Sequence, residues 1–331
     1  MNRFEFARPS SVADAVALLT GKHDETSVLA GGTDLLSLMK DFVVEPKRLV
    51  SLMGIEEMHG SAIGTGTGNP GAMAVGATMT LDWLLDNRDV KTHWRAVWQA
   101  ADGIKSPQLR TMGTIGGELL QRPRCWYFRR GHGLLAERDG ESMPVKGDNR
   151  YHAVFGNAGP AKFVNASSLA PALIACGATV TVAGPKGPRT IPVKDLYTTP
   201  KSAAERELTL AANEIVTSIN LQGPPATKSA TYEVRPRHGL DWPLVTASVA
   251  LGFDGATIKS AVVVLGHVAP TPWVADGAAK ALIGHAFDDK LAHAAATAAV
   301  AGATPLSKNA YKVELAQVAV RRALAAATAA A

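Results

Sequence analysis

Residues 25–41, ETSVLAGGTDLLSLMKD, are the stretch that most constrains how this chain folds. Residues 27–30 have the pattern of a short buried strand, Gly31-Gly32 interrupts it, and residues 35–39 supply one apolar face of a helix capped by Thr33-Asp34. Adjacent glycines leave backbone N–H groups uncovered beside a positive helix terminus, which predicts a cradle for a phosphate or pyrophosphate. The segment is neither a Walker loop nor a G-x-G-x-x-G fingerprint, and an ordinary structural turn is the alternative.

A second glycine loop, residues 111–117 with the sequence TMGTIGG, begins 80 positions after Gly31. Its glycines are again expected to expose backbone donors, and Thr111 and Thr114 add hydroxyl groups that bond phosphate oxygens. Two such loops predict a clamp that holds one pyrophosphate from both sides. Two unrelated turns are the alternative.

Composition narrows the class of protein. With 331 residues, 47% of them hydrophobic, the chain is long enough for two or three packed domains. It lacks both the roughly 20-residue apolar run of a membrane helix and, in MNRFEFARPS, the apolar core of a signal peptide. We expect folding in the cytosol without a membrane span; export in the folded state beside a partner is the alternative.

Charge and cysteine usage exclude further classes. The net charge of +5 does not by itself indicate nucleic acid. Arginines and aromatic residues interleave over residues 110–130. We interpret this pattern as a subunit interface or the entrance to a cofactor site, in preference to a nucleic-acid site. The two cysteines, Cys125 and Cys176, form no C-x-x-C motif, so neither a disulfide framework nor a structural zinc site is predicted.

The pattern of elements predicts three domains: an N-terminal subdomain over residues 1–54, a second over 55–221 and a third over 226–331, after a linker at 222–225. The expected helices are 12–20 (capped by Ser11), 35–40, one after Thr80, 93–104, 169–176, 274–283, 288–301 and 308–328 (capped by Ser307). The expected strands are 26–30, 49–52, two between 63 and 78, 151–155, 161–165, 178–182, 189–193, 216–221, 230–234, 245–253 and 258–268. The third domain is therefore expected to be α+β, with helices on one face of an antiparallel sheet.

Constellations of catalytic side chains are missing from the sequence. It contains no H-E-x-x-H and no G-x-S-x-G, and its histidines are scattered. We interpret Cys176 as a core residue. Cys125 lies among arginines that would lower the pKa of an exposed thiol, but a structural role is favoured for it. We assign no catalytic residue.

Several ordered motifs carry a resemblance to a known family. They are LAGGTDLL at 29–36, RTMGTIGGELLQRPRCWYFR at 110–129, RHGLDWPLV at 237–245, LGHVAPTPW at 265–273 and PLSKNAYKVELAQVAVRRAL at 305–324. Together they resemble the flavin-binding medium subunit of the xanthine dehydrogenase and carbon monoxide dehydrogenase family of molybdenum hydroxylases. The match runs nearly end to end and comes nearest to the aldehyde oxidoreductase subgroup, whose medium subunit carries an extra Fe-S cluster. The resemblance implies an α+β protein with a vanillyl-alcohol-oxidase (PCMH) type FAD-binding fold in two subdomains, plus a C-terminal α+β domain.

The resemblance also implies which residues contact FAD. By motif, the pyrophosphate would be held from one side by Leu29, Ala30, Gly31, Gly32, Thr33, Asp34 and Leu35, and from the other by Thr114, Ile115, Gly116 and Gly117. Further contacts would come from Gln108, Thr111, Glu118, Ser168, Lys194 and Tyr197.

Three departures from the family pattern matter. Glu118 stands where the family usually has Asn, so its carboxylate is expected to turn away from the phosphates, and Ser168 stands where an acidic flavin contact is usual. The segment QRPRCWYFR resembles that of the cluster-bearing subgroup, whose additional [4Fe-4S] cluster needs four thiolates. Cys125 matches the first, but residues 131–160 contain no cysteine. We therefore expect no [4Fe-4S] cluster.

The function implied by the resemblance is electron transfer within a complex. A large molybdenum subunit would oxidise the substrate, and a small subunit with [2Fe-2S] centres would pass the electrons to FAD in this chain. From there they would go to a small-molecule or protein acceptor. The resemblance allows the complex to be a dimer of heterotrimers. Alternatives are a structural subunit with a degenerate flavin site, suggested by Glu118 and Ser168, and a stand-alone flavin oxidase.

Overall fold

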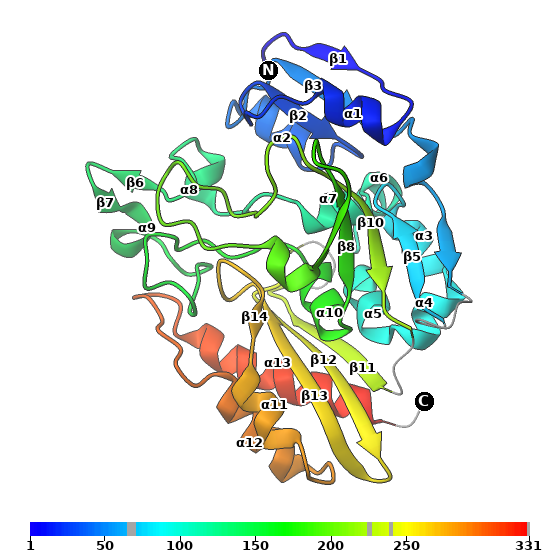
Figure 1. The fold of residues 1–331 in the computed structure, drawn as a ribbon. Coiled ribbons are helices and arrows are strands. Elements are labelled where there is room, and N and C mark those ends of the chain that lie inside the picture. The colour runs from blue at the N-terminus through cyan, green and yellow to red at the C-terminus, as the bar shows by residue number, and fades with distance from the viewer. Residues whose placement is uncertain (65–70, 224–226, 238–240, 330–331) are drawn as a thin grey trace.

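The protein is described by a computed structural model that covers residues 1–64, 71–223, 227–237 and 241–329 (Figure 1). The described part contains three main sheets and a small hairpin. The predicted linker at 222–225 lies partly outside the described residues. No helix in the described part of the chain has the length and apolar character that crossing a bilayer requires.

The N-terminal lobe is a small parallel sheet with two helices. It comprises β1 (Glu5–Ala7), α1 (Val12–Leu18), β2 (Thr26–Leu29), α2 (Leu35–Lys40) and β3 (Arg48–Ser51), with the strand order β1-β3-β2. Ser11 caps α1 as predicted, because its hydroxyl accepts a hydrogen bond from the backbone of Asp14. Asp34 precedes α2, but its side chain makes no capping bond there, so that part of the prediction was wrong. Since β2 is an edge strand, the loop that follows it is open to the neighbouring subdomain.

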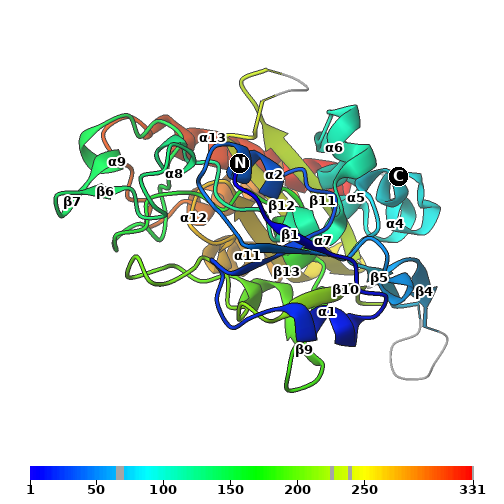
Figure 2. The same ribbon diagram turned by 90° about the horizontal axis from the view of Figure 1, so that it is seen from above.

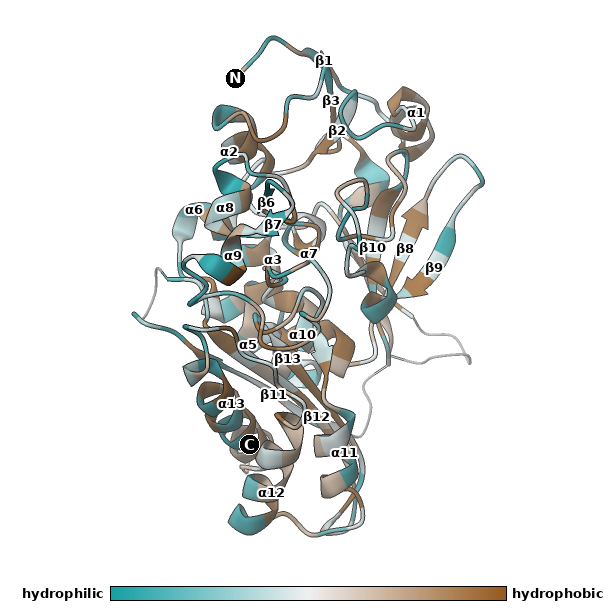
Figure 3. Ribbon diagram, turned by 90° about the vertical axis from the view of Figure 1, so that its left-hand side faces the viewer, coloured by the Kyte–Doolittle hydropathy of each residue, from teal (hydrophilic) through white to brown (hydrophobic). Residues whose placement is uncertain are grey.

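The second sheet is antiparallel, in the order β4-β5-β10-β8-β9. Its strands are β4 (Ser61–Ile63), β5 (Met73–Gly76), β8 (Thr179–Ala183), β9 (Arg189–Pro192) and β10 (Ile215–Leu221). Figure 3 shows hydrophobic residues on β8 and β10, of which Val180, Val182, Ile215 and Ile219 are buried. The helices of this region are α3 (Leu81–Asp86), α4 (Arg88–His93), α5 (Arg95–Gly103), α6 (Pro107–Met112), α7 (Ile115–Leu119) and α10 (Leu169–Ala175). Thr80 caps α3 as predicted, whereas the helix predicted over 93–104 is interrupted at Trp94, which ends α4 and precedes α5.

A long excursion separates α7 from α10. It holds α8 (Trp126–Arg129), the hairpin of β6 (Glu137–Arg138) and β7 (Glu141–Ser142), and α9 (Met143–Lys146). Figures 1 and 2 both show this hairpin projecting from one side of the molecule. The strands predicted at 151–155 and 161–165 are absent from this described segment. Their apolar residues are buried without a sheet, because Val154 and Phe155 donate backbone hydrogen bonds to the carbonyl of Val268 at 2.8 and 3.1 Å.

The C-terminal region is an antiparallel sheet in the order β11-β12-β13-β14, with three helices. Its elements are β11 (Thr227–Val234), β12 (Val245–Asp254), β13 (Thr257–Gly266), β14 (Trp273–Val274), α11 (Asp276–Leu282), α12 (Asp289–Ala299) and α13 (Tyr311–Thr328). The predicted hairpin joins β12 to β13, where Gly255 has a φ of +58°. Ser307 does not cap α13, which starts after Ala310; its hydroxyl instead accepts a hydrogen bond from the Asn149 side chain at 3.0 Å.

The domain's own helices α11, α12 and α13 cover one face of this sheet, as predicted, and α5 and α10 of the preceding region cover the other. Val249 of β12 packs in the cluster formed with α11, α12 and α13, whereas the adjacent Ala250 packs in the cluster that includes α5 and α10. Successive residues of a strand point to opposite faces, so both faces are buried. This explains why most of β12 is apolar or small instead of alternating with charged residues.

Candidate functional site

The two glycine loops lie against each other. A Cβ atom placed on Gly31 would lie 1.6 Å from the carbonyl oxygen of Met112, the residue before Gly113 in the second loop. Only glycine permits this approach of two backbones. Gly32 has a φ of +73°, which favours glycine at the second position as well. Two segments that the sequence separates by 80 positions therefore form one junction.

A cavity of about 230 Å³ opens at this junction. Residues 28–35 form one wall, and Thr114, Gly116 and Gly117 of the second loop form another. The lining also includes Arg122, Arg206 and most of the segment 208–216. This segment, which leads into β10, was not singled out in the sequence because it carries no motif.

The first loop supplies the free hydrogen-bond donors. Within the described structure, the backbone N–H groups of residues 30–35 donate to no protein acceptor. Buried or partly buried N–H groups almost always find a partner, so a run of consecutive unpaired donors around a cavity is suited to an anion with several oxygens. This arrangement fits a pyrophosphate.

The second loop behaves differently from the prediction that its glycines expose donors. Gly116 donates to the Ala77 carbonyl at 2.9 Å, Gly117 to the Thr114 hydroxyl at 3.1 Å, and Ile115 to the Met79 carbonyl at 2.8 Å. These N–H groups are therefore already used. The reason is that the loop pairs with residues 77–79 and starts the short helix α7. The role left to its glycines is close packing, since a Cβ atom on Gly116 would lie 2.9 Å from that of Ala77 and one on Gly113 would lie 2.3 Å from the Leu109 carbonyl oxygen.

Two arginines, Arg122 and Arg206, line the cavity together with the carboxylates of Asp34 and Glu214. Partial burial together with the Arg206 and Arg122 guanidinium groups lowers the pKa of His23 to about 4. Arg122 pairs with the buried carboxylate of Glu207. Burial is the larger cause of the lowered pKa of His23, and the smaller contribution of the two arginines is a positive field that favours a bound anion at the cavity.

Asp34 connects the first loop to the arginine-rich segment. Its carboxylate accepts a hydrogen bond from the Arg122 backbone at 2.8 Å and pairs with Arg129 at 2.8 Å and Arg124 at 3.1 Å. These partners lie some ninety positions away in the sequence. The arginine cluster noted in the sequence thus lies beside the cavity, with its charge partly neutralised by a residue of the cradle.

Glu118 does not direct its carboxylate at the free donors of the cradle. It is buried and accepts hydrogen bonds from the Ser167 hydroxyl and the Ser168 backbone, both at 2.6 Å, and from the Leu169 backbone at 3.3 Å. Burial raises its pKa to about 7, despite these donors. The carboxylate therefore joins α7 to the start of α10, and the Ser168 side chain is buried beneath it.

The remaining predicted contacts lie outside the cavity walls. Tyr197 is buried and donates to the carbonyl of Leu119 at 3.0 Å, which places it behind α7. Gln108, Thr111 and Lys194 are exposed, and Thr111 donates to the Asp82 carboxylate at 3.0 Å. Their contact with a cofactor stays a prediction.

Cys125 lies within the arginine-rich segment, directly after Arg124. Its sulfur is 3.2 Å from Nε2 of His152, and burial raises its pKa. A thiol of this kind is not activated as a nucleophile. Among the residues that the structure describes, no three His, Cys, Asp or Glu side chains gather as a metal site.

Comparison with known proteins agrees with this geometry. Residues 2–222 match the family model described as the FAD binding domain in molybdopterin dehydrogenase. The chain belongs to this family. Residues 230–327 match a second model, the CO dehydrogenase flavoprotein C-terminal domain. The chain is thus an FAD-binding medium subunit of the molybdenum hydroxylase family and a flavoprotein component of an oxidoreductase, as the sequence motifs predicted.

Individual relatives cover nearly the whole chain. The carbon monoxide dehydrogenase medium chain of Afipia carboxidovorans is 29% identical over 97% of this chain and 95% of its own length. The aldehyde oxidoreductase FAD-binding subunit PaoB of Escherichia coli is 29% identical over 99% of both chains. Among solved structures, reconstituted CO dehydrogenase from Oligotropha carboxidovorans has a TM-score of 0.76 at 26% identity, covering 100% of this chain and 99% of that one. The predicted fold class is confirmed.

Proposed function

We propose that this chain binds FAD with the pyrophosphate on residues 30–35 and relays electrons through it in a complex with two partner subunits. The observation that carries the proposal is the run of unpaired backbone donors beside a cavity that Arg122 and Arg206 also line. Thr114, Gly116 and Gly117 would close the site from the other side. We also propose that the chain divides into domains after residue 54 and between residues 221 and 226.

The groove continues beyond the cradle, which supports binding of an extended dinucleotide. A small cavity of about 30 Å³ shares Thr33 and Gly117 with the cradle and also contacts Arg124 and Trp242. These last two residues line the next, larger cavity. Polar walls near the cradle thus lead to aromatic walls farther on, in the order that a phosphate-linked flavin requires.

The chain's own residues would bind, orient and shield the cofactor. A bound flavin exchanges single electrons as well as pairs, which is the chemistry that this family needs from it. No acid, base or nucleophile of the chain is assigned, consistent with the predicted absence of catalytic side chains.

The partners follow from the relatives, which are named as the medium chain or FAD-binding subunit of larger enzymes. We propose a large molybdenum-cofactor subunit that oxidises the substrate and a small subunit whose [2Fe-2S] centres deliver electrons to this chain. We further propose that the chain itself holds no [4Fe-4S] cluster, since Cys125 has no second cysteine within residues 131–160.

The test is a titration of the purified full chain with FAD and, separately, with FMN, which lacks the pyrophosphate bridge. We expect FAD to bind stoichiometrically, with visible flavin absorption, and FMN to bind much more weakly. A colourless chain that binds neither would establish the degenerate structural subunit instead. Size-exclusion chromatography of the native protein tests the alternative of a stand-alone flavin oxidase, because such an enzyme would elute without two other chains.

A further inference from the structure

The connection between η2 (Val193–Leu196) and β10 passes along one wall of the cradle cavity. Its course is fixed by contacts with the rest of the subdomain. The backbone N–H of Thr198 donates to the Glu207 carbonyl at 3.1 Å, and Leu208 packs against the hydrophobic core that includes α10. Arg206, which lies between these anchored positions, is therefore held at the cavity by a fixed backbone.

Arg206 lines the cavity and makes no hydrogen bond within the described part of the chain. Its Nε is buried without a partner, and the carboxylate oxygen of Glu207 that forms an ion pair with it lies 3.7 Å away, beyond hydrogen-bond distance. The side chain as a whole is 28% exposed, and neither Nη1 nor Nη2 is among the atoms buried without a partner. The outer end of the guanidinium group is therefore accessible to a ligand.

The other charged side chains that line the cavity already have partners. Arg122 bonds both carboxylate oxygens of Glu207. Asp34 pairs with two arginines of the segment after α7, and Glu214 accepts two hydrogen bonds from a third arginine, each of 2.9 Å. Among the charged groups of this lining, Arg206 is thus the one that no hydrogen bond in the described structure satisfies.

An unsatisfied guanidinium group in a partly buried place is unfavourable in the free protein. Burial, followed by repulsion from Arg122, lowers the pKa of Arg206 to about 10, so the group stays protonated near pH 7. A bound anion would supply both the missing acceptor and the missing counter-charge. The backbone N–H groups of residues 30–35 carry only partial charges, so a full positive charge at the cradle has to come from a side chain.

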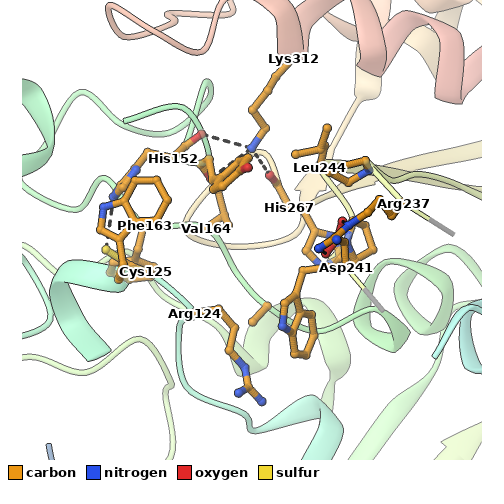
Figure 4. Close-up of a pocket in the computed structure, with 16 residues that line it drawn as sticks. Arg124, Cys125, His152, Phe163, Val164, Arg237, Asp241, Leu244, His267 and Lys312 are labelled. Carbon is orange, nitrogen blue, oxygen red and sulfur yellow. Dashed lines mark hydrogen bonds and ion pairs between the residues drawn. The ribbon is translucent and has the colours of Figure 1, made fainter. Parts of the chain in front are cut away.

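The larger cavity beyond the groove, of about 490 Å³, shows the opposite arrangement (Figure 4). Lys312 is buried there and donates to three backbone carbonyls, as the dashed lines in Figure 4 indicate. Arg237 pairs with Asp241 at 2.9 Å, and Arg124 pairs with Asp34 at 3.1 Å. The cations of that cavity are used within the protein, whereas the cradle keeps one that is not.

We propose that Arg206 is a phosphate-binding residue that donates through Nη1 and Nη2 to the diphosphate held on residues 30–35. The inference rests on the proposed function and adds to the backbone cradle a side chain that carries a full charge. The planar guanidinium group can bond two phosphate oxygens at once, which a lysine at the same position could not reproduce.

The test measures FAD affinity by calorimetry on the FAD-free full chain, for the native protein and for two variants. We expect Arg206→Gln to bind FAD about 10- to 100-fold more weakly, because a charge-assisted contact is lost. Arg206→Lys should bind about 3- to 10-fold more weakly, since it keeps the charge without the fork. Arg138→Gln is the matched control, because Arg138 is exposed on β6 and does not line the cavity; it should bind FAD like the native chain.

The stability of the FAD-free chain separates binding from folding. Because Arg206 makes no hydrogen bond in the described structure, Arg206→Gln should leave the urea midpoint unchanged or raise it while FAD affinity falls. A variant whose lower affinity is matched by a lower urea midpoint would assign Arg206 a structural role and overturn the proposal. Native FAD affinity in a folded Arg206→Gln chain would overturn it as well.

Inorganic pyrophosphate is the second probe, and it distinguishes this inference from the proposed function. If the native chain binds no FAD but binds pyrophosphate more tightly than Arg206→Gln does, the proposed function fails and the role of Arg206 stands. If FAD binds equally well to both chains, the role of Arg206 fails and the proposed function stands. A native chain that binds neither probe would overturn both.

Discussion

Replacing Gly31 by alanine should separate the two loops and release FAD. The new Cβ would lie 1.6 Å from the Met112 carbonyl oxygen, whereas real Cβ contacts stay beyond 3.0 Å, so the backbones must part by about 1.4 Å. One of the two atoms is a backbone oxygen and the other is a Cβ atom. Neither moves when a side chain changes rotamer, so no rotamer change relieves the overlap. A movement of that size breaks hydrogen bonds between the cradle and a phosphate. Losing one charge-assisted bond costs about 1.5–3 kcal/mol, or about 10- to 150-fold in FAD affinity.

The assay compares FAD content and the dissociation constant of the reconstituted chain in Gly31→Ala and in Gly21→Ala. A Cβ on Gly21 meets nothing within 4 Å, so this control carries the same substitution without the overlap. We expect the control to bind FAD like the native chain. A folded Gly31→Ala chain with native FAD affinity would refute the argument that contact between the loops shapes the site.

Three further predictions concern single side chains. The pKa of Glu118 is raised from 4.5 to about 7, so between these pH values the folded state keeps a proton that the unfolded state loses. The free energy of unfolding should therefore fall as pH rises through this window, by up to about 3 kcal/mol. Urea unfolding at about pH 5 and about pH 8 should show a smaller fall for Glu118→Gln, and an identical fall would contradict a raised pKa. Asp34→Asn should cost about 1–3 kcal/mol, since Arg129 loses its carboxylate while its Nη1 is already buried without a partner; the exposed Asp41→Asn is the control, and equal stability of both would argue against the network. Native chain and Cys125→Ser should contain equally little iron and acid-labile sulfide, and stoichiometric iron in the native chain would disprove the expected absence of a cluster.

Local patterns in the sequence predicted local structure well. The strand, glycine turn and helix around Gly31 follow from adjacent residues, and the hairpin at Gly255 follows from its turn signal. The apolar segment at 151–155 misled the prediction, because it is buried against the carbonyl of Val268 without joining a sheet. Hydrophobicity reports burial, and burial need not mean a strand.

The site itself depends on contacts that a linear reading does not contain. The second loop offers no free donors: the N–H groups of Ile115 and Gly116 donate to carbonyls of residues 77–79, and that of Gly117 donates to the Thr114 hydroxyl. Asp34 has the pattern of a helix cap, yet its charge is used by arginines of a distant segment. Motif resemblance placed both loops beside one cofactor, whereas the division of labour between them required three-dimensional structure.

The double covering of β12 has a practical consequence for anyone dividing this protein into fragments. Cutting the chain after β10 would separate α5 and α10 from the surface around Ala250 and Val264. Both fragments would then expose hydrophobic surface that is buried in the whole chain. Such fragments should aggregate unless a detergent is present, even though the two family models divide the chain at this boundary. The flavin-binding half and its C-terminal companion are therefore best expressed, purified and crystallised as a single polypeptide.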